Sequence, residues 1–428
     1  MRRLFSASCL LLLCVIALSA GVREDFKANP LLSANNYQAY PASGFPALTA
    51  APAGYEPFFI NHYGRHGSRW LINEKKYTYP LQMLEKGERN GKLTRRGQEV
   101  LDILRQVHSA SKGRLGELSD IGHEQHRQIA ERMYHNFPQV FQDGAPVRAR
   151  STVVIRCILS MENELHALLL KNPDLHITHD ASEHDMYYMN LHDAKLNERK
   201  HSKAGDDALK AYREKHVDNS RVVNSLFNDT AYVHHNVSGN LGHYLFKLAS
   251  NLQSTELRKQ ITLYDIFTRE ELYRNWLGQN AGWYIGYGFC PKNGATQPYS
   301  QRNLLRKIIE QADSCILLER PGATLRFGHE TMVLPLTCLL GLNGYDQQID
   351  DLEQLESRGW INYRVFPMGA NIQFIFYRKA FGDSDILFKV LLNEDEATLP
   401  LKTDCAPYYH WADFREHYLK MLNAYKGE

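Results

Sequence analysis

The chain has 428 residues, of which 50 are basic and 48 acidic, so its net charge is only +2. This balance argues against a general nucleic-acid-binding protein, because such proteins carry a clear basic excess. Any anion binding must therefore come from a local cluster of cations. With 43% hydrophobic and 23% charged residues, the composition fits one large globular domain with an insertion, or two domains.

Residues 1–20, MRRLFSASCLLLLCVIALSA, have the pattern of a signal peptide. Arg2 and Arg3 precede an apolar core, Leu10 to Leu18, that is too short to span a bilayer. The alternative, an N-terminal membrane anchor, is disfavoured by this length. We therefore expect an exported protein, periplasmic, secreted or at the outer surface, with no membrane segment after cleavage.

The first half of the remaining chain alternates strands and helices. The apolar run 58–60 predicts a strand that leads into a loop at Gly64, and apolar residues at helical spacing predict helices over 94–111 and 118–137. A strand at 146–148, a helix over 151–173 that Ser151 or Thr152 can cap, and a strand at 174–180 follow. This order is typical of an α/β fold with a mostly parallel sheet flanked by helices.

From 183 to 299 the alternation stops, and the chain becomes polar and helical, with a capping box at Thr268 and Glu271. After 300 it resumes with a helix over 301–319, a strand at 324–327 entering a helix, two strands within 370–394 and a last helix over 411–425. We predict an α/β catalytic domain formed by 21–182 and 300–428. Residues 183–299 are predicted to form a helical insertion domain that sets substrate specificity.

Cationic groups follow three of the predicted strands. Arg65, His66 and Arg69 come after the first strand, Arg156 lies one turn into the helix after the second, and His329 follows the strand that ends at Phe327. Because ligands bind beyond the carboxyl ends of parallel strands, we expect these side chains to meet in one site. Arg156 as a structural arginine paired with a carboxylate is the alternative.

These residue types indicate phosphoryl transfer. Guanidinium groups donate bidentately to phosphate oxygens, and a neutral imidazole is a competent nucleophile at phosphorus. His66 is therefore the predicted nucleophile, and the arginines with His329 stabilise charge on the transferring group. Glu330, next to His329, is the predicted acid for the leaving oxygen, although a glutamate that only favours a helix N-terminus is the alternative.

These motifs resemble those of the histidine acid phosphatases, the branch of the histidine phosphatase superfamily that includes phytases. The family's R-H-G-x-R is Arg65 to Arg69, its "ST…R" stretch is similar to RSTVVIRCILS with Arg156, and GELSDIGHEQH and FGHET match two further motifs. Within the family, RHGSR, RCILS and FGH…LPL are most similar to multiple inositol polyphosphate phosphatases. That clade usually has His-Ala-Glu, whereas this chain has His329-Glu330-Thr331, with Glu330 where other phytases and acid phosphatases have Asp.

The resemblance implies a phosphoglycerate mutase-like core, a phosphohistidine on His66 and hydrolysis of phytate or related inositol polyphosphates. We expect no metal and no cofactor, because the arginines supply the positive charge, and the remaining cysteines show no zinc-ligand or C-x-x-C spacing. A broad acid or sugar phosphatase with the same core and a non-catalytic inositol-phosphate-binding protein are the alternatives. Cations expected at the pocket rim, where a solvated and salt-bridged helix face is the other interpretation, are Lys195, Arg199, Lys200 and Lys203.

Two further histidines, His123 and His126, are spaced as a metal pair on a helix but lack a third ligand. They are predicted to be surface or supporting residues. His62, at the end of the first strand, is predicted to be structural.

Overall fold

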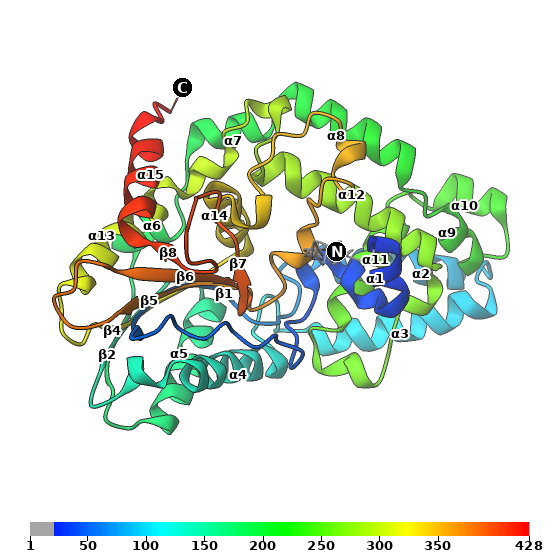
Figure 1. Ribbon diagram of the computed structural model, residues 1–428. Coiled ribbons are helices and arrows are strands. Elements are labelled where there is room, and N and C mark those ends of the chain that lie inside the picture. Colours follow the sequence, from blue (N-terminus) through cyan, green and yellow to red (C-terminus); the bar gives the residue numbers. More distant parts are fainter. Residues whose placement is uncertain (1–20, 428) are drawn as a thin grey trace, which may run out of the picture.

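The computed structural model describes residues 21–427, so the predicted signal peptide of residues 1–20 lies outside the described part of the chain. In that part, one eight-stranded sheet has the order β3-β2-β4-β1-β5-β6-β7, and β8 pairs with β6 (Figure 1). The strands are β1 (Glu56–Arg65), β2 (Pro146–Ser151), β3 (His176–Ala181), β4 (Gly322–Gly328), β5 (Asn371–Arg378), β6 (Leu387–Leu392), β7 (Asp395–Ala397) and β8 (Tyr409–His410).

The strands β1 to β4 are parallel to one another, and β6 runs in the same direction because β5 is antiparallel to both β1 and β6. The predicted α/β fold with a mostly parallel sheet is confirmed. The register brings the carboxyl ends of three strands together, since Arg65 of β1 pairs with Gly328 of β4, and Ser151 of β2 pairs with Phe327 of β4. The loops after β1, β2 and β4 therefore start at one edge of the sheet, as the site prediction requires.

Helices cover both faces of the sheet (Figure 1). Phe59 and Ile60 of β1 point to opposite faces, because side chains alternate along a strand, and each belongs to a different hydrophobic core cluster. Ile60 packs in the cluster of the helices below the sheet in Figure 1, α4 (Asp120–Asn136) and α5 (Ile155–Lys171). Phe59 packs in the cluster that includes α13 (Arg302–Ile316), α14 (Glu330–Leu340) and α15 (Trp411–Ala424).

The predicted cap of α5 is wrong. The helix begins at Ile155, and its N-cap residue, Val154, makes no side-chain capping bond. Ser151 is the last residue of β2, and its hydroxyl donates to the carbonyl of Thr152. The hydroxyl of Thr152 in turn contacts Nε2 of His329. The polar residues at this strand end therefore contact the edge of the sheet where the site lies instead of starting the helix.

The segment 183–299 is helical, as expected, and contains none of the named strands. Its capping box at Thr268 and Glu271 is confirmed. The helices α9 (Ser220–Leu226) and α11 (Leu241–Leu252) share a hydrophobic core with α2 (Lys75–Arg89) and α3 (Arg95–Ser111), which precede this segment in the chain (Figure 1). The helical part thus also uses residues from before 183, and the domain boundaries stay a prediction. The remaining α-helices of the described part are α1 (Val22–Ala28), α6 (Met186–Met189), α7 (Ala194–Lys200), α8 (Lys203–His216), α10 (Thr230–Asn236) and α12 (Arg269–Tyr287).

Candidate active site

The loop that follows β1 is clamped between α4 and α5. The amide of Gly67 donates to Ser160 Oγ of α5 at 3.1 Å, and the amide of Ser68 donates to Gln125 Oε1 of α4 at 2.8 Å. A Cβ atom on Gly67 would lie 2.5 Å from the carbonyl oxygen of Gly122, so only glycine permits this approach of the loop to α4. The loop backbone is therefore fixed before any ligand arrives.

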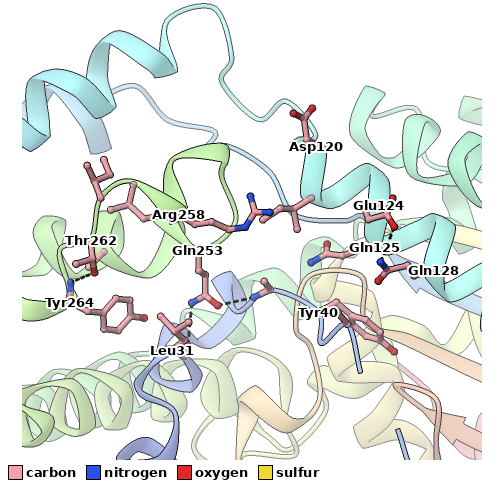
Figure 2. Close-up of a pocket in the computed structure, with 16 residues that line it drawn as sticks. Leu31, Tyr40, Asp120, Glu124, Gln125, Gln128, Gln253, Arg258, Thr262 and Tyr264 are labelled. Carbon is pink, nitrogen blue, oxygen red and sulfur yellow. Dashed lines mark hydrogen bonds between the residues drawn. The ribbon is translucent and has the colours of Figure 1, made fainter. Parts of the chain in front are cut away.

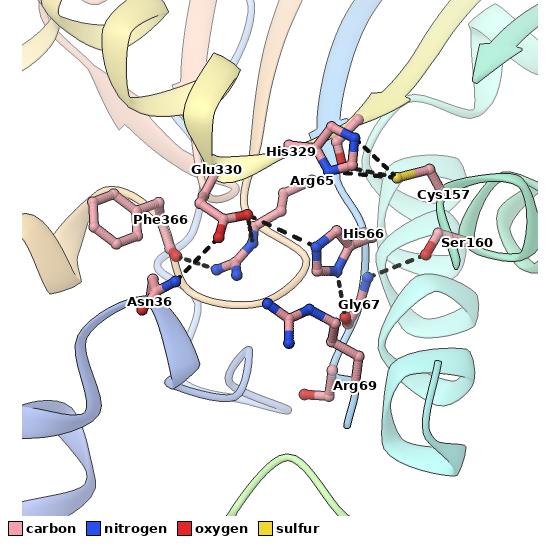
Figure 3. Close-up of polar contacts among 12 residues, drawn as sticks. Asn36, Arg65, His66, Gly67, Arg69, Cys157, Ser160, His329, Glu330 and Phe366 are labelled. Atoms are coloured by element: carbon pink, nitrogen blue, oxygen red, sulfur yellow. Dashed lines mark hydrogen bonds and ion pairs between the residues drawn. The ribbon is translucent and has the colours of Figure 1, made fainter. Parts of the chain in front are cut away.

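His66 is fully buried at the centre of this loop (Figure 3). Its Nδ1 lies 2.9 Å from the carbonyl oxygen of Gly67. Because a carbonyl only accepts, Nδ1 carries the proton and Nε2 keeps its lone pair in the neutral ring. Burial lowers the pKa of His66 well below its usual range, and the charges of Arg65 and Arg156 lower it further. The ring is therefore neutral, with an unprotonated Nε2 that makes no hydrogen bond to a described residue.

The three predicted arginines surround this imidazole. Arg65 is fully buried and donates to the carbonyl of Phe366 at 2.7 Å, and Arg69 donates to the carbonyl of Trp70 at 2.9 Å. Buried N–H groups with no hydrogen-bond partner among the described residues remain on Arg65 (Nη2), Arg69 (Nε) and Arg156 (Nε). Burial lowers the pKa of Arg65 to about 10 and also lowers that of Arg156. Unpartnered guanidinium donors in a buried site favour a bound anion.

The ring of His329 lies next to that of His66, with 5.7 Å between the ring centroids. Thr152 Oγ1 is 3.3 Å from its Nε2, and Cys157 Sγ is 3.8 Å from both of its ring nitrogens. Burial lowers the pKa of His329 to about 4, despite the opposing effect of Glu330. At neutral pH this ring is therefore a polar, uncharged group facing the nucleophile.

Glu330 is the first residue of α14, and its carboxylate points toward Arg65 and His66 (Figure 3). Its Oε2 lies 3.1 Å from Arg65 Nε and 3.8 Å from His66 Nε2, and its Oε1 accepts a bond from Asn36 Nδ2 at 3.1 Å. Burial raises the pKa of Glu330, but Arg65, Arg69 and His329 outweigh this effect and bring it to about 2. Glu330 is thus a carboxylate that partly neutralises the arginines.

A metal ion is disfavoured in this cluster, although His66, His329 and Glu330 offer ligand atoms within 4.8 Å of one another. Arg65 contacts the carboxylate of Glu330 and places a permanent positive charge at the position that a cation would occupy. The surroundings fit an anion instead.

The structure separates the four cations predicted at the pocket rim. Lys195, Arg199 and Lys203 line a surface pocket that contains none of the core site residues, and Lys203 pairs there with Asp207. Of the four, Lys200 lies nearest to the His66 site, because its Nζ is 3.7 Å from the ring centroid of Tyr287. The pKa of Tyr287 is raised by burial and by the charge of Glu330, so this ring borders the site.

Two further cations near the site, Lys76 and Lys247, were not singled out from the sequence. Lys76 of α2 donates to the hydroxyl of Tyr37 at 3.1 Å, and Arg69 lies 5.8 Å from the centroid of the same ring. Burial raises the pKa of Tyr37, yet the pKa is lowered overall by Lys76, Arg69 and Lys247 of α11. Burial and the charges of Lys247, Arg213 and Lys76 lower the pKa of His243 to about 4. The positive potential of the arginines therefore continues into the helical part of the molecule.

These added cations lack counter-ions. Lys76, Arg213 and Lys247 form no ion pair with any residue in 21–427, although many surface lysines and arginines of this chain do. Lys76 and Lys247 come from α2 and α11, which are far apart in the sequence, so only packing of these helices could show the group.

A separate cavity of about 610 Å³ is lined by residues of α4 and of the segment around Gln253 (Figure 2). Its mainly apolar wall includes Leu31, Ile121 and Leu252, and none of the predicted site residues. Gln125 links it to the loop, because the same side chain lines the cavity and accepts the Ser68 amide bond.

The family model "Histidine phosphatase superfamily (branch 2)" matches residues 64–393, whereas no curated protein matches the chain. A Bifidobacterium longum multiple inositol polyphosphate phosphatase in complex with inositol hexasulfate has a TM-score of 0.73 at 18% identity, covering 90% of this chain and 96% of that chain.

Two phytases have the same fold. The phytase from D. castellii has a TM-score of 0.68 at 14% identity, over 93% of this chain and 86% of that chain. The apo form of Hafnia alvei phytase has a TM-score of 0.52 at 14% identity, over 87% of this chain and 98% of that chain. At these identities the likeness is one of fold.

Proposed function

Because the chain belongs to the histidine phosphatase superfamily (branch 2) and is therefore a phosphatase, we propose that it hydrolyses phosphomonoesters through a phosphohistidine on His66. The observation that carries this mechanism is the unprotonated, unpartnered Nε2 of a buried histidine that is surrounded by three arginines. The alternatives of a sugar phosphatase or a non-catalytic binding protein are outcomes of the experiments below.

The first step is attack of His66 Nε2 on phosphorus. The guanidinium groups of Arg65, Arg69 and Arg156 bind the non-bridging oxygens, and His329 donates to one of them. The P–N bond forms as the P–O bond to the alcohol breaks, and the departing oxygen takes a proton from Glu330. In the second step Glu330, now a carboxylate, removes a proton from water, which attacks phosphorus, breaks the P–N bond and releases inorganic phosphate.

Glu330 must gain a proton before it can serve as the acid. The ligand-free pKa of about 2 reflects the nearby arginines. A bound phosphate dianion competes for Arg65 and adds negative charge next to the carboxylate, and both effects raise the pKa of Glu330. Substrate binding thus prepares the acid that the reaction needs.

We propose inositol polyphosphates, with phytate as the reference compound, as the substrate class. The supporting observation is the group of cations Lys76, Arg213 and Lys247, which have no ion-pair partner within 21–427 and extend from Arg69 into the helical part. A monophosphate occupies the arginine pocket only, whereas a ring with several phosphates also supplies the missing counter-ions. The structural neighbour from Bifidobacterium longum is in complex with inositol hexasulfate, which, like phytate, is an inositol ring that carries six anionic groups.

The substrate class is tested by comparing phosphate release from phytate, glucose phosphate and a small aryl phosphate. Lys76→Met and Lys247→Met should each raise the KM for phytate ten- to hundredfold, because a charge-assisted bond is worth about 1.5–3 kcal/mol. The same variants should leave kcat/KM for the aryl phosphate within about twofold. The exposed neighbour Lys75→Met is the matched control. A wild-type enzyme with no preference for phytate refutes the substrate class while leaving the phosphatase mechanism intact.

The mechanism is tested with His66→Ala. We expect this variant to bind phytate but to form no phosphoenzyme, whereas wild type, quenched in acid-free denaturant, carries one acid-labile phosphate. Equally slow phosphate release by wild type and variant, with phytate still bound by wild type, would favour the non-catalytic alternative. Equally fast release would rule out His66 as the nucleophile.

We propose that the enzyme acts after export, as residues 1–20 predict. Residues 21–427 contain no helix with the length and apolarity of a membrane span. N-terminal sequencing of the protein recovered from outside the cytoplasm tests this, and an uncleaved Met1 end would contradict it.

A further inference from the structure

Three metal-ligating side chains meet at the end of the sheet opposite to His66. Asp404, Cys405 and His410 each offer one ligand atom, and these atoms lie within 4.8 Å of one another. His410 belongs to β8 and pairs with Leu387, the first residue of β6, which runs in the same direction as β1. His66 follows the last residue of β1, so the two clusters lie at opposite ends of the strands.

The two ring nitrogens of His410 have different partners. Nε2 lies 3.1 Å from Asp404 Oδ1, inside the cluster, and Nδ1 lies 3.1 Å from Asp385 Oδ1, outside it. Asp385 is held in turn by the hydroxyl of Tyr55 and lies 3.9 Å from Lys379 Nζ. Metal-binding histidines commonly donate the second ring N–H to a carboxylate, which fixes the tautomer and the ring orientation. Asp385 provides such a carboxylate here.

Cys405 completes the set with a sulfur atom. Among the described cysteines it is the one that is not buried, and no disulfide engages it. Its Sγ has only long contacts, 3.5 Å to Thr403 Oγ1 and 3.6 Å to the carbonyl oxygen of Tyr408. A thiolate, an imidazole and a carboxylate are together a ligand set for Zn²⁺, which takes four ligands in a tetrahedron.

We propose that Asp404, Cys405 and His410 bind one Zn²⁺ ion, with solvent as the fourth ligand and Asp385 orienting His410. The ion joins the segment before β8 to the first residues of α15, which His410 precedes. It is remote from the arginines, so it stabilises the fold and takes no part in phosphoryl transfer. The competing explanation is an imidazolium held between two carboxylates, Asp385 and Asp404, with no metal.

The test uses the mature protein without an affinity tag, stripped with a chelator and titrated with Co²⁺ as a spectroscopic probe. We expect one equivalent to bind with visible bands of tetrahedral cobalt and a near-ultraviolet sulfur-to-cobalt charge-transfer band. Cys405→Ser should abolish the charge-transfer band, and the buried cysteine variant Cys315→Ser should retain it. Zn²⁺ should displace the cobalt and raise the Tm, because it binds the native state.

Further variants separate this site from the catalytic cluster and from misfolding. Asp385→Asn should keep the bands but weaken binding about ten- to hundredfold, as expected for a carboxylate behind a ligand. His66→Ala should bind cobalt as wild type does, and Cys405→Ser should retain wild-type hydrolysis of an aryl phosphate, which shows that it is folded. The absence of a charge-transfer band in wild type, or its persistence in Cys405→Ser, overturns the proposal in favour of the metal-free imidazolium.

Discussion

Glu330 gives the sharpest test of the proposed chemistry, because it is a carboxylate paired with Arg65 in the free enzyme and must be a protonated acid when substrate is bound. In the ligand-free site its pKa is lowered from 4.5 to about 2. At about 1.4 kcal/mol per pKa unit, this shift favours the carboxylate by roughly 3 kcal/mol. At pH 5 about one free enzyme molecule in a thousand would carry the proton. Activity at that pH therefore requires the substrate phosphate to raise the pKa.

Glu330→Gln removes the acid and also removes the negative charge 3.1 Å from Arg65 Nε. We expect kcat for phytate to fall about 10²- to 10⁴-fold, the usual contribution of general acid catalysis. An aryl phosphate, whose leaving group needs no proton, should lose less than about tenfold in the first step. Because the arginines lose their internal partner, inorganic phosphate should inhibit the variant at least about tenfold more tightly, which is about 1.4 kcal/mol.

The assay measures steady-state kcat and, in the burst phase, the rate of phosphoenzyme formation for both substrates. The inhibition constant of phosphate is measured alongside. Glu330→Asp is the matched control, because it keeps the acid but shortens its reach. An equal loss of the burst rate for phytate and for the aryl phosphate would refute the role of Glu330 as leaving-group acid. An unchanged inhibition constant would refute its competition with phosphate for Arg65.

Two further predictions concern the loop and the strand beneath it. Gly67→Ala places a Cβ 2.5 Å from the carbonyl oxygen of Gly122, so we expect the loop to shift and kcat to fall about 10²-fold. The control is Gly239→Ala, whose added Cβ meets nothing within 4 Å. Equal kcat values in both variants would contradict the argument. Burial lowers the pKa of His62 to about 3, so the folded state resists a proton that the unfolded state accepts, and stability is lost as the pH falls from about 6.5 towards 3. His62→Leu should therefore lose less stability than wild type between pH 7 and pH 5, and the two free energies of unfolding should diverge by up to about 1.4 kcal/mol per pH unit. Parallel Tm curves for the two proteins would count against a neutral buried His62.

The sequence also left one supporting pair unrecognised. His126 was expected to be a surface or supporting residue, and it is fully buried with Nδ1 2.7 Å from Glu164 Oε1. The pair joins α4 to α5, beside the residues that accept the loop amides, Gln125 and Ser160. Helical spacing placed His126 on α4, but spacing carries no information on the partner helix.

The sequence alone determined the features that depend on near neighbours in the chain. Apolar periodicity predicted α3, α4 and the alternation of strands and helices, and R-H-G-x-R with the histidine and acid after β4 predicted the core site. These signals are local, because side-chain direction in a helix or strand follows from the backbone period. Local signals have limits even there. Ser151 was predicted to cap α5, but it ends β2 and its hydroxyl donates to the carbonyl of Thr152 instead.

Tertiary structure alone decided which distant residues share the site. The neighbourhood of β1, β4 and β2 brings Arg65, Arg156 and His329 to one edge, and the packing of α2 on α11 adds Lys76 and Lys247 beside Tyr37. The charge state of each group was decided at the same level, because burial and converging arginines shift the pKa values of His66 and Glu330 downwards. Desolvation and Coulomb interactions depend on distances in space, which a single sequence does not contain.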